Sequence, residues 1–222
     1  MQSKSQSAAN PHEVQHAWHS RGYLPHFESK HHLQHVTVHL ADSLPREAIE
    51  QIDEMIRTVP GQERTIERRK RLNAWMDAGH GSCILKPAEV AKIVQDALMY
   101  FEEERYRLFA WVIMPNHFHV LFQSFNNWTL AKIVASWKKF TARQIRDWLN
   151  ANQEICDPGN AALLSCNSVW HPEYWDRYIR NENHFNHTVD YIHQNPVKAG
   201  LVAQANDWPW SSATTYPGTP IS

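Results

Sequence analysis

Two histidines separated by one residue, His117 and His119, lie in a run of strand-forming residues, 117–124. Side chains alternate between the two faces of a strand, so both imidazoles point to one side and Phe118 to the other. Such a pair can share a divalent metal ion if one or two further ligands come from elsewhere. The same spacing is also common in surface histidines, so the pattern alone leaves both readings open. In either case we expect the two side chains to be exposed on the sheet.

A second group of reactive side chains lies on one stripe of a helix predicted over residues 183–195, because they recur at intervals of three or four. They are His184, His187, Tyr191 and Asn195. Tyr191 could supply an oxygen nucleophile and Asn195 an oxygen ligand. A tyrosine on an amphipathic helix is ordinarily a packing residue, so the stripe alone assigns no chemistry.

Cations that could follow a phosphate backbone occur in two segments. The first is a polar helix predicted over residues 63–79, with Arg68, Arg69 and Arg71 as candidates. The second is a helix predicted over residues 130–149, where Lys132, Lys139, Arg143 and Arg146 share one face, opposite the apolar residues. Both sets are candidate DNA-binding residues, and the alternative for each is a solvated helix face.

Composition restricts the possible functions of this chain of 222 residues. The 22 basic and 23 acidic residues give a formal charge of −1, so any DNA-binding surface must be local. The three cysteines, Cys83, Cys156 and Cys166, form no CxxC pair, which argues against a disulfide framework and a cysteine-based zinc site. No apolar run is long enough for a membrane span and the start does not resemble a signal peptide, so we expect a cytoplasmic protein without a membrane partner.

Hydrophobic periodicity and turn residues predict the order of the elements. The expected elements are a strand over 33–40, a helix over 45–59, the polar helix over 63–79, a helix that opens at Pro87 and ends near 102–104, strands over 105–114 and 117–124, the helix over 130–149, a loop at 157–160, and the helix over 183–195 that Pro196 stops. The two strands flank Pro115 and Asn116, whose chemistry favours a turn, so they should form an antiparallel hairpin.

This order predicts an α+β fold, specifically a ferredoxin-like antiparallel sheet with helices packed on one face. The helical segment 44–80 is an insertion after the first strand, and the tyrosine-bearing helix is a C-terminal addition. We expect a single domain over residues 31–215, preceded by a polar N-terminal arm, 1–30, and followed by a tail, 216–222. The latter part of the arm, RGYLPHF, is expected to pack locally.

Three motifs give the chain a family resemblance: MPNHFHVLF at 114–122, YWDRYIR at 174–180 and YIHQNPVKAGLV at 191–202. Together they resemble the single-tyrosine transposases of the HUH endonuclease superfamily, in which two histidines flank a hydrophobic residue. The closer resemblance is to the REP-associated tyrosine transposases, supported by RGYLPHF, LADSLP, DAGHGSCIL and WPWSS, and it covers nearly the whole chain.

The resemblance implies a role for each candidate in the two reactive groups. His117, His119 and Asn195 would bind Mg²⁺ or Mn²⁺, and Tyr191 would form a covalent 5′-phosphotyrosine link to DNA. Some relatives have glutamine at the position of Asn195. We expect a bacterial enzyme that cleaves and rejoins single-stranded or hairpin-forming DNA, as a monomer or homodimer.

Two other functions fit the same residues. A metal-dependent hydrolase could use a water molecule activated beside His117 and His119, with Tyr191 only orienting the substrate. A non-catalytic protein could retain the fold to bind DNA hairpins. A covalent protein–DNA adduct would exclude the first of these, and metal-dependent nicking would exclude the second.

Overall fold

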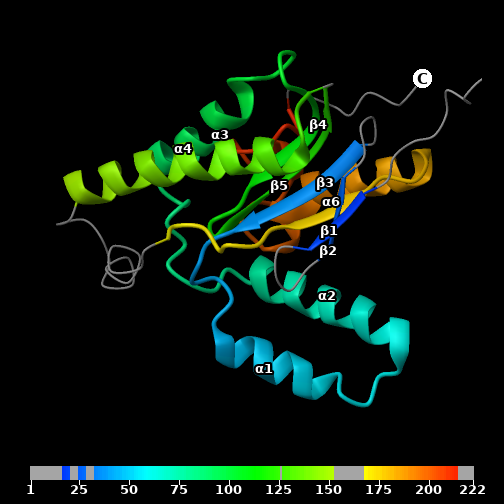
Figure 1. Cartoon of the computed structure of the whole chain (residues 1–222). Helices are drawn as coiled ribbons and strands as arrows, with labels where there is room; N and C mark the ends of the chain where they lie inside the picture. Colours follow the sequence, from blue (N-terminus) through cyan, green and yellow to red (C-terminus); the bar gives the residue numbers. More distant parts are fainter. Residues whose placement is uncertain (1–16, 21–24, 29–32, 126, 153–167, 215–222) are drawn as a thin grey trace, which may run out of the picture.

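A four-stranded antiparallel sheet forms the centre of the protein (Figure 1). The computed structural model describes residues 17–20, 25–28, 33–125, 127–152 and 168–214. The strands are β3 (Leu33–His39), β4 (Tyr106–Ile113), β5 (His117–Ser124) and β6 (Trp175–Tyr178), in the order β4-β5-β3-β6. With α3 (Ala88–Met99) and α4 (Leu130–Ala151) between them, the chain order is β3-α3-β4-β5-α4-β6. This βαββαβ order confirms the predicted α+β, ferredoxin-like fold.

The predicted hairpin is confirmed as β4 and β5, which pair antiparallel with Ile113 opposite Phe118. Its turn at Pro115 and Asn116 is held from outside the hairpin. The backbone N–H of Leu85 donates to the Pro115 carbonyl (3.0 Å), and that of Leu40 donates to the Asn116 carbonyl (2.9 Å). These two bonds fix the start of β5, where the histidine pair lies.

One face of the sheet packs against α3 and α4 and contains the main hydrophobic core. Phe118, Val120 and Phe122 project from β5 into this core, as their alternation with the histidines predicts. Two of its polar side chains are joined by hydrogen bonds: Trp137 Nε1 donates to the Tyr106 hydroxyl (2.9 Å), which donates to the Leu98 carbonyl (2.8 Å). This face therefore provides the rigid support for the opposite one.

The tyrosine-bearing helix, α6 (Glu182–Lys198), covers the opposite face of β4 and β5. Phe185, Val189 and Ile192 pack there with Val112 and Leu121. The histidine pair projects from this same face of the sheet. The side of α6 that does not carry these apolar residues can therefore reach the imidazoles.

The prediction that Pro196 stops this helix is wrong, since α6 continues to Lys198. A proline lacks the N–H that would bond to the preceding turn, but its neighbours can complete the final turn. Here the N–H of Ala199 donates to the Asn195 carbonyl (3.0 Å).

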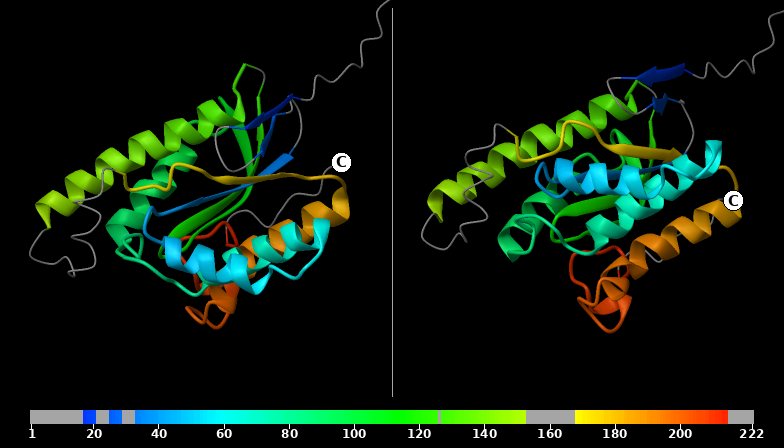
Figure 2. Two further views of the ribbon diagram at one scale, coloured as in Figure 1. Left: turned by 60° about the horizontal axis from the view of Figure 1, so that its bottom comes forward. Right: turned by 90° about the horizontal axis from the view of Figure 1, so that it is seen from below.

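The predicted insertion forms two helices, α1 (Arg46–Met55) and α2 (Gly61–Asp77), with a small core of their own. This core contains Leu44, Ile52, Leu72 and Met76. The two helices lie on the side of the sheet away from α3 and α4, and α2 lies in front of the sheet when the molecule is seen from below (Figure 2). Although its segment is highly charged, α2 buries Leu72 and Met76 completely or nearly so.

Three short strands were missed. The edge strand β6 has only four residues, too few to show a period, and it forms because β3 offers a free edge. Within the predicted arm, β1 (Ala17–Ser20) and β2 (Pro25–Glu28) pair antiparallel. The loop at 157–160 and the tail at 216–222 lie outside the described residues, and the predicted domain limits stay a prediction.

The last described residues cover the outer edge of β4. After η1 (Ala205–Asp207), the carbonyl of Trp210 accepts from the N–H of Ile113 (2.8 Å), and the N–H of Ser212 donates to the Trp111 carbonyl (2.9 Å). Among the described helices, none has the length and apolarity needed to cross a membrane.

The small core under α2 should contribute measurably to stability. We predict that Leu72→Ala, which truncates a side chain that is 4% exposed, lowers the free energy of unfolding by about 2–5 kcal/mol in urea titrations. Ile66→Ala on the same helix is the control, because Ile66 is 69% exposed and its truncation should have little effect. Equal effects of the two changes would show that α2 is not packed in this way.

Candidate active site

The two histidines of β5 are completely buried, so the expectation that they are exposed on the sheet is wrong. Both project from the face opposite the main core, as predicted by alternation. That face is not open to solvent, because α6 packs across β4 and β5 and the end of α2 approaches His117. A sequence pattern reports which side chains share a face, but not whether another element covers it.

Hydrogen bonds to the Nδ1 atoms orient both imidazoles. His117 Nδ1 lies 2.7 Å from Asn116 Oδ1, and His119 Nδ1 lies 2.8 Å from the Thr37 hydroxyl. The Asn116 oxygen can only accept, so His117 carries its proton on Nδ1 and has a free lone pair on Nε2. A proton on His119 Nδ1 would likewise leave its Nε2 free. The two Nε2 atoms are 3.1 Å apart and converge on one point.

Burial keeps both imidazoles neutral. It lowers the pKa of His117 to about 3, and it lowers the pKa of His119 well below 6.5, with smaller effects from the neighbouring His117 and His35. A neutral imidazole is the form that binds metal ions. The environment therefore favours two nitrogen ligands over two charged side chains at neutral pH.

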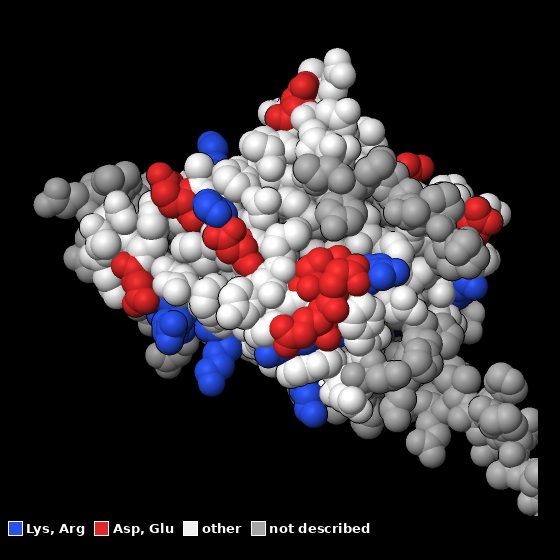
Figure 3. All heavy atoms as spheres, turned by 90° about the horizontal axis from the view of Figure 1, so that it is seen from above, with Lys and Arg blue, Asp and Glu red and all other residues white. Residues whose placement is uncertain are grey.

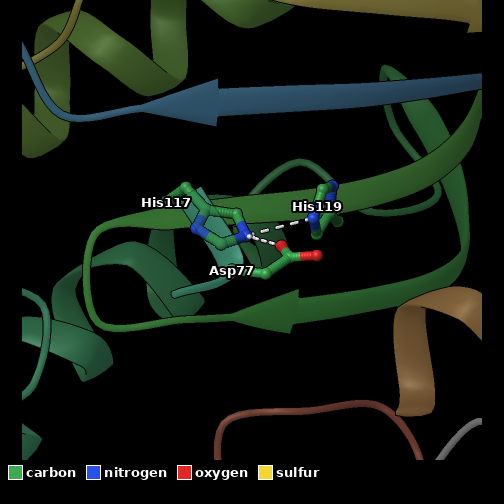
Figure 4. A group of neighbouring side chains, drawn as sticks. All are labelled: Asp77, His117 and His119. Atoms are coloured by element: carbon green, nitrogen blue, oxygen red, sulfur yellow. Dashed lines mark hydrogen bonds and ion pairs between the residues drawn. The ribbon is translucent and has the colours of Figure 1, made fainter. Parts of the chain in front are cut away.

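Asp77, the last residue of α2, completes a group of three potential metal ligands that the sequence did not suggest (Figure 4). Its Oδ1 lies 3.5 Å from His117 Nε2, and the ligand atoms of Asp77, His117 and His119 all lie within 4.8 Å of one another. Burial raises the pKa of Asp77 to about 6, while a hydrogen bond from Asn195 and the charge of Lys198 oppose the rise. This group could hold a divalent metal ion.

Asn195 brings a fourth candidate ligand from α6. Its Nδ2 donates to Asp77 Oδ1 (3.4 Å), whereas its Oδ1 is buried without a hydrogen-bond partner among the described residues. An unsatisfied buried acceptor costs about 1–3 kcal/mol, and a bound cation would remove that cost. Two neutral imidazoles, a carboxylate and an amide oxygen thus fit a divalent ion such as Mn²⁺.

Tyr191 places its hydroxyl 3.5 Å from His119 Nε2, one helical turn before Asn195 on α6. Burial raises the pKa of the phenol above its usual value, and the negative charge of Asp77 adds to the rise. The stripe predicted on α6 therefore comes together with the histidine pair. His184 and His187 continue it, lining a cavity beside Tyr191.

The basic residues predicted on α4 do not reach this site. Lys132, Lys139 and Arg143 are exposed and Arg146 is half-buried, on a helix that packs against the other face of the sheet. Figure 3, which views the molecule from the α3 and α4 side, shows Lys and Arg interspersed with Asp and Glu over this surface, with several of the basic groups along its lower edge. Any DNA contact by α4 is thus separate from the chemistry at Tyr191.

The three arginines predicted on α2 have different surroundings. Arg68 forms an ion pair with Asp53 (2.5 Å) and Arg71 forms one with Glu67 (2.8 Å). Arg69 instead lines the cavity beside Tyr191. The structure therefore brings one of the three, Arg69, to the candidate site.

Comparison with known proteins identifies the family. Residues 66–195 match the family model described as "Transposase IS200 like", a range that includes Asp77, both histidines, Tyr191 and Asn195. The chain belongs to the IS200-like transposase family. Its histidine pair and Tyr191 thus lie within the matched range.

Two similar proteins carry the name of a narrower group. The REP-associated tyrosine transposase of Escherichia coli (strain K12) is 30% identical over 122 residues, which are 54% of this chain and 63% of that protein. The chain thus spans less than two thirds of the length of this relative. A solved REP-associated tyrosine transposase bound to a REP hairpin is 21% identical, with a TM-score of 0.49 over 87% of this chain and 81% of that one.

The role of Asp77 can be tested by metal titration. We predict that Asp77→Asn weakens Mn²⁺ binding in calorimetry by at least about tenfold, because loss of even an indirect partner of a metal ligand costs about 10–100-fold. Asp53→Asn is the matched control, since Asp53 is exposed and pairs with Arg68 on the outer side of α2. Unchanged Mn²⁺ affinity of the Asp77→Asn protein would remove Asp77 from the ligand set.

Proposed function

We propose that this transposase is a metal-dependent endonuclease and strand transferase that cleaves and rejoins single-stranded, hairpin-forming DNA. The observation that carries the proposal is the position of the Tyr191 hydroxyl, 3.5 Å from His119 Nε2 and beside the ligand group of Asp77, His117 and His119. A nucleophile next to a group of metal ligands is the arrangement that phosphoryl transfer requires.

In the proposed reaction Tyr191 attacks a DNA phosphate in line with the 3′ oxygen of the leaving strand. The Tyr191 Oη–P bond forms and the P–O3′ bond breaks, which leaves a 5′-phosphotyrosine and a free 3′-hydroxyl. The phenol loses its proton and the 3′ oxygen gains one, so charge is balanced. Because one phosphodiester replaces another, a 3′-hydroxyl can reverse the attack without a nucleotide cofactor.

The proposed roles of the remaining residues follow from their positions. His117 and His119, with Asp77 and Asn195, would hold Mg²⁺ or Mn²⁺. When bound, the ion would offset the negative charge of the phosphate oxygens and favour the phenolate. The side chains alone oppose that ionisation, since both burial and Asp77 raise the pKa of Tyr191.

The choice of substrate rests on the site and on the relative. The histidines are buried between the sheet, α2 and α6, which suits an unpaired strand better than a duplex. The name of the E. coli relative associates it with REP sequences, and we extend this to hairpin-forming DNA here. An enzyme acting on bacterial DNA would work in the cytoplasm.

The exposed basic side of α4 is proposed to bind the backbone of the same DNA. Replacing Lys139, Arg143 and Arg146 together by Gln should weaken binding to a DNA hairpin. It should also reduce the slope of log K against log salt by about 2, because each phosphate contact with a single strand contributes about 0.7. Fluorescence anisotropy over a salt series measures this, and an unchanged slope would assign α4 to plain solvent exposure.

The nucleophile is tested by deleting a single hydroxyl. With Mn²⁺ and a single-stranded hairpin substrate, the wild type should form a denaturant-resistant adduct with the 5′ phosphate of the fragment downstream of the cut, and fully duplex DNA should react poorly. Tyr191→Phe should form no adduct while retaining its fold and DNA affinity, because the ring remains.

Tyr178→Phe is the control for this experiment, since Tyr178 lies on β6 and should not affect adduct formation. Adducts are detected by denaturing gel electrophoresis with labelled DNA. Cleavage by the Tyr191→Phe protein at the normal rate, with no adduct in either protein, would identify water as the nucleophile and contradict the proposal.

A further inference from the structure

A cavity of about 280 Å³ opens beside Tyr191, away from the group of metal ligands. Its walls come from α2, β3, β6 and α6, and its basic or aromatic lining residues are His35, Arg69, Trp175, Arg177, His184 and His187. The volume is close to the lower end of the roughly 300–1,000 Å³ that ligand sites occupy, and exceeds the space one free anion needs. None of the roles proposed above uses this cavity.

Arg177 reaches the cavity because of the register of the sheet. It lies opposite His35 in the pairing of β6 with β3, so its side chain leaves the sheet on the histidine face. Arg177 forms no ion pair with the described residues. Partial burial, with the nearby charges of Arg69 and Arg180, lowers the pKa of its guanidinium.

Arg69 reaches the same cavity from α2. It lies four residues before Asn73 and eight before Asp77, so these three side chains follow one stripe of the helix. Unlike Arg68 and Arg71, Arg69 has no carboxylate partner among the described residues. One exposed arginine of the charged segment therefore lines the same cavity as Tyr191.

The two arginines line one cavity, and the charge of Arg69 is felt at Arg177, with no carboxylate among the described residues acting on Arg177 in the opposite direction. Asp176 is the one acidic residue of the lining, but it alternates with Arg177 on β6 and pairs with Val36, whose side chain lies in the core on the other face. Unpaired cations in a concave site concentrate field lines and attract anions. An arginine can also bind two oxygens of one phosphate at once, which holds the phosphate in a fixed position.

We propose that this cavity binds an internucleotide phosphate of the DNA strand next to the scissile one, held by Arg69 and Arg177. His184 and His187 on α6 would add hydrogen bonds to the same nucleotide. This inference rests on the proposed function, because a strand attacked by Tyr191 must continue past it. Holding the neighbouring phosphate would fix the scissile phosphate in line with the tyrosine hydroxyl.

The test measures binding without chemistry. The full chain is titrated in EDTA with a thymidine dodecamer over a salt series, and the affinities of the wild type, Arg69→Gln and Arg177→Gln are compared. Each substitution should weaken binding and reduce the slope of log K against log salt by about 0.7, the contribution of one single-strand phosphate contact. Thermal unfolding of each variant establishes that the fold is retained.

Arg57→Gln is the matched control. It removes the same charge from an exposed arginine that pairs with Glu54 (3.4 Å) after α1, so the slope should not change. A dodecamer with neutral methylphosphonate linkages should bind weakly to the wild type and lose no further affinity in either cavity variant. Slopes equal to that of the wild type in both cavity variants would overturn the proposal.

A competition experiment distinguishes binding of a DNA phosphate from binding of a free anion. At matched ionic strength, inorganic phosphate should not displace the dodecamer, and efficient displacement would overturn the assignment to DNA.

The measured salt slopes are also independent of the nicking reaction. A wild type that forms no adduct with Mn²⁺ but shows the predicted slopes would refute the proposed chemistry and retain the phosphate-binding cavity.

Discussion

The amide of Asn116 is the single side chain on which the geometry of the site depends most. Its Oδ1 accepts a hydrogen bond from His117, and its Nδ2 donates to the carbonyls of Met76 (3.1 Å) and His80 (2.8 Å). One planar group thus sets the tautomer of a ligand and anchors the end of α2, where Asp77 lies. A site assembled from distant segments needs such a rigid link, because small displacements of ligands are costly to function.

The two faces of the sheet have different roles: one carries the main hydrophobic core, and the other carries the candidate active site. The face under α3 and α4 is mostly apolar, whereas the face under α2 and α6 buries two imidazoles and an amide beside the half-buried carboxylate of Asp77. Buried polar groups of this kind are expensive unless they are paired or bind a cation. The large apolar core on one side therefore offsets the cost of the polar group on the other.

Local patterns in the sequence were sufficient to predict the hairpin, the shared face of His117 and His119, and the stripe that contains Tyr191. Each of these depends on residues close together in the chain. Asp77 was missed because it lies 40 residues before His117, in a charged helix of the kind that usually faces solvent. Arg177 was missed for a different reason: it lies on a four-residue strand that forms only through pairing with β3.

Arg69, Asn73 and Asp77 lie on one stripe of α2, so the site depends on the number of residues between them. An α-helix turns by about 100° per residue, so eight residues make slightly more than two turns and leave the two ends on one side. Inserting or deleting one residue between them would rotate one end by about 100° relative to the other. Mutations that change the length of this helix should therefore be tolerated at its N-terminal end or in the loop before it, and rejected between residues 69 and 77.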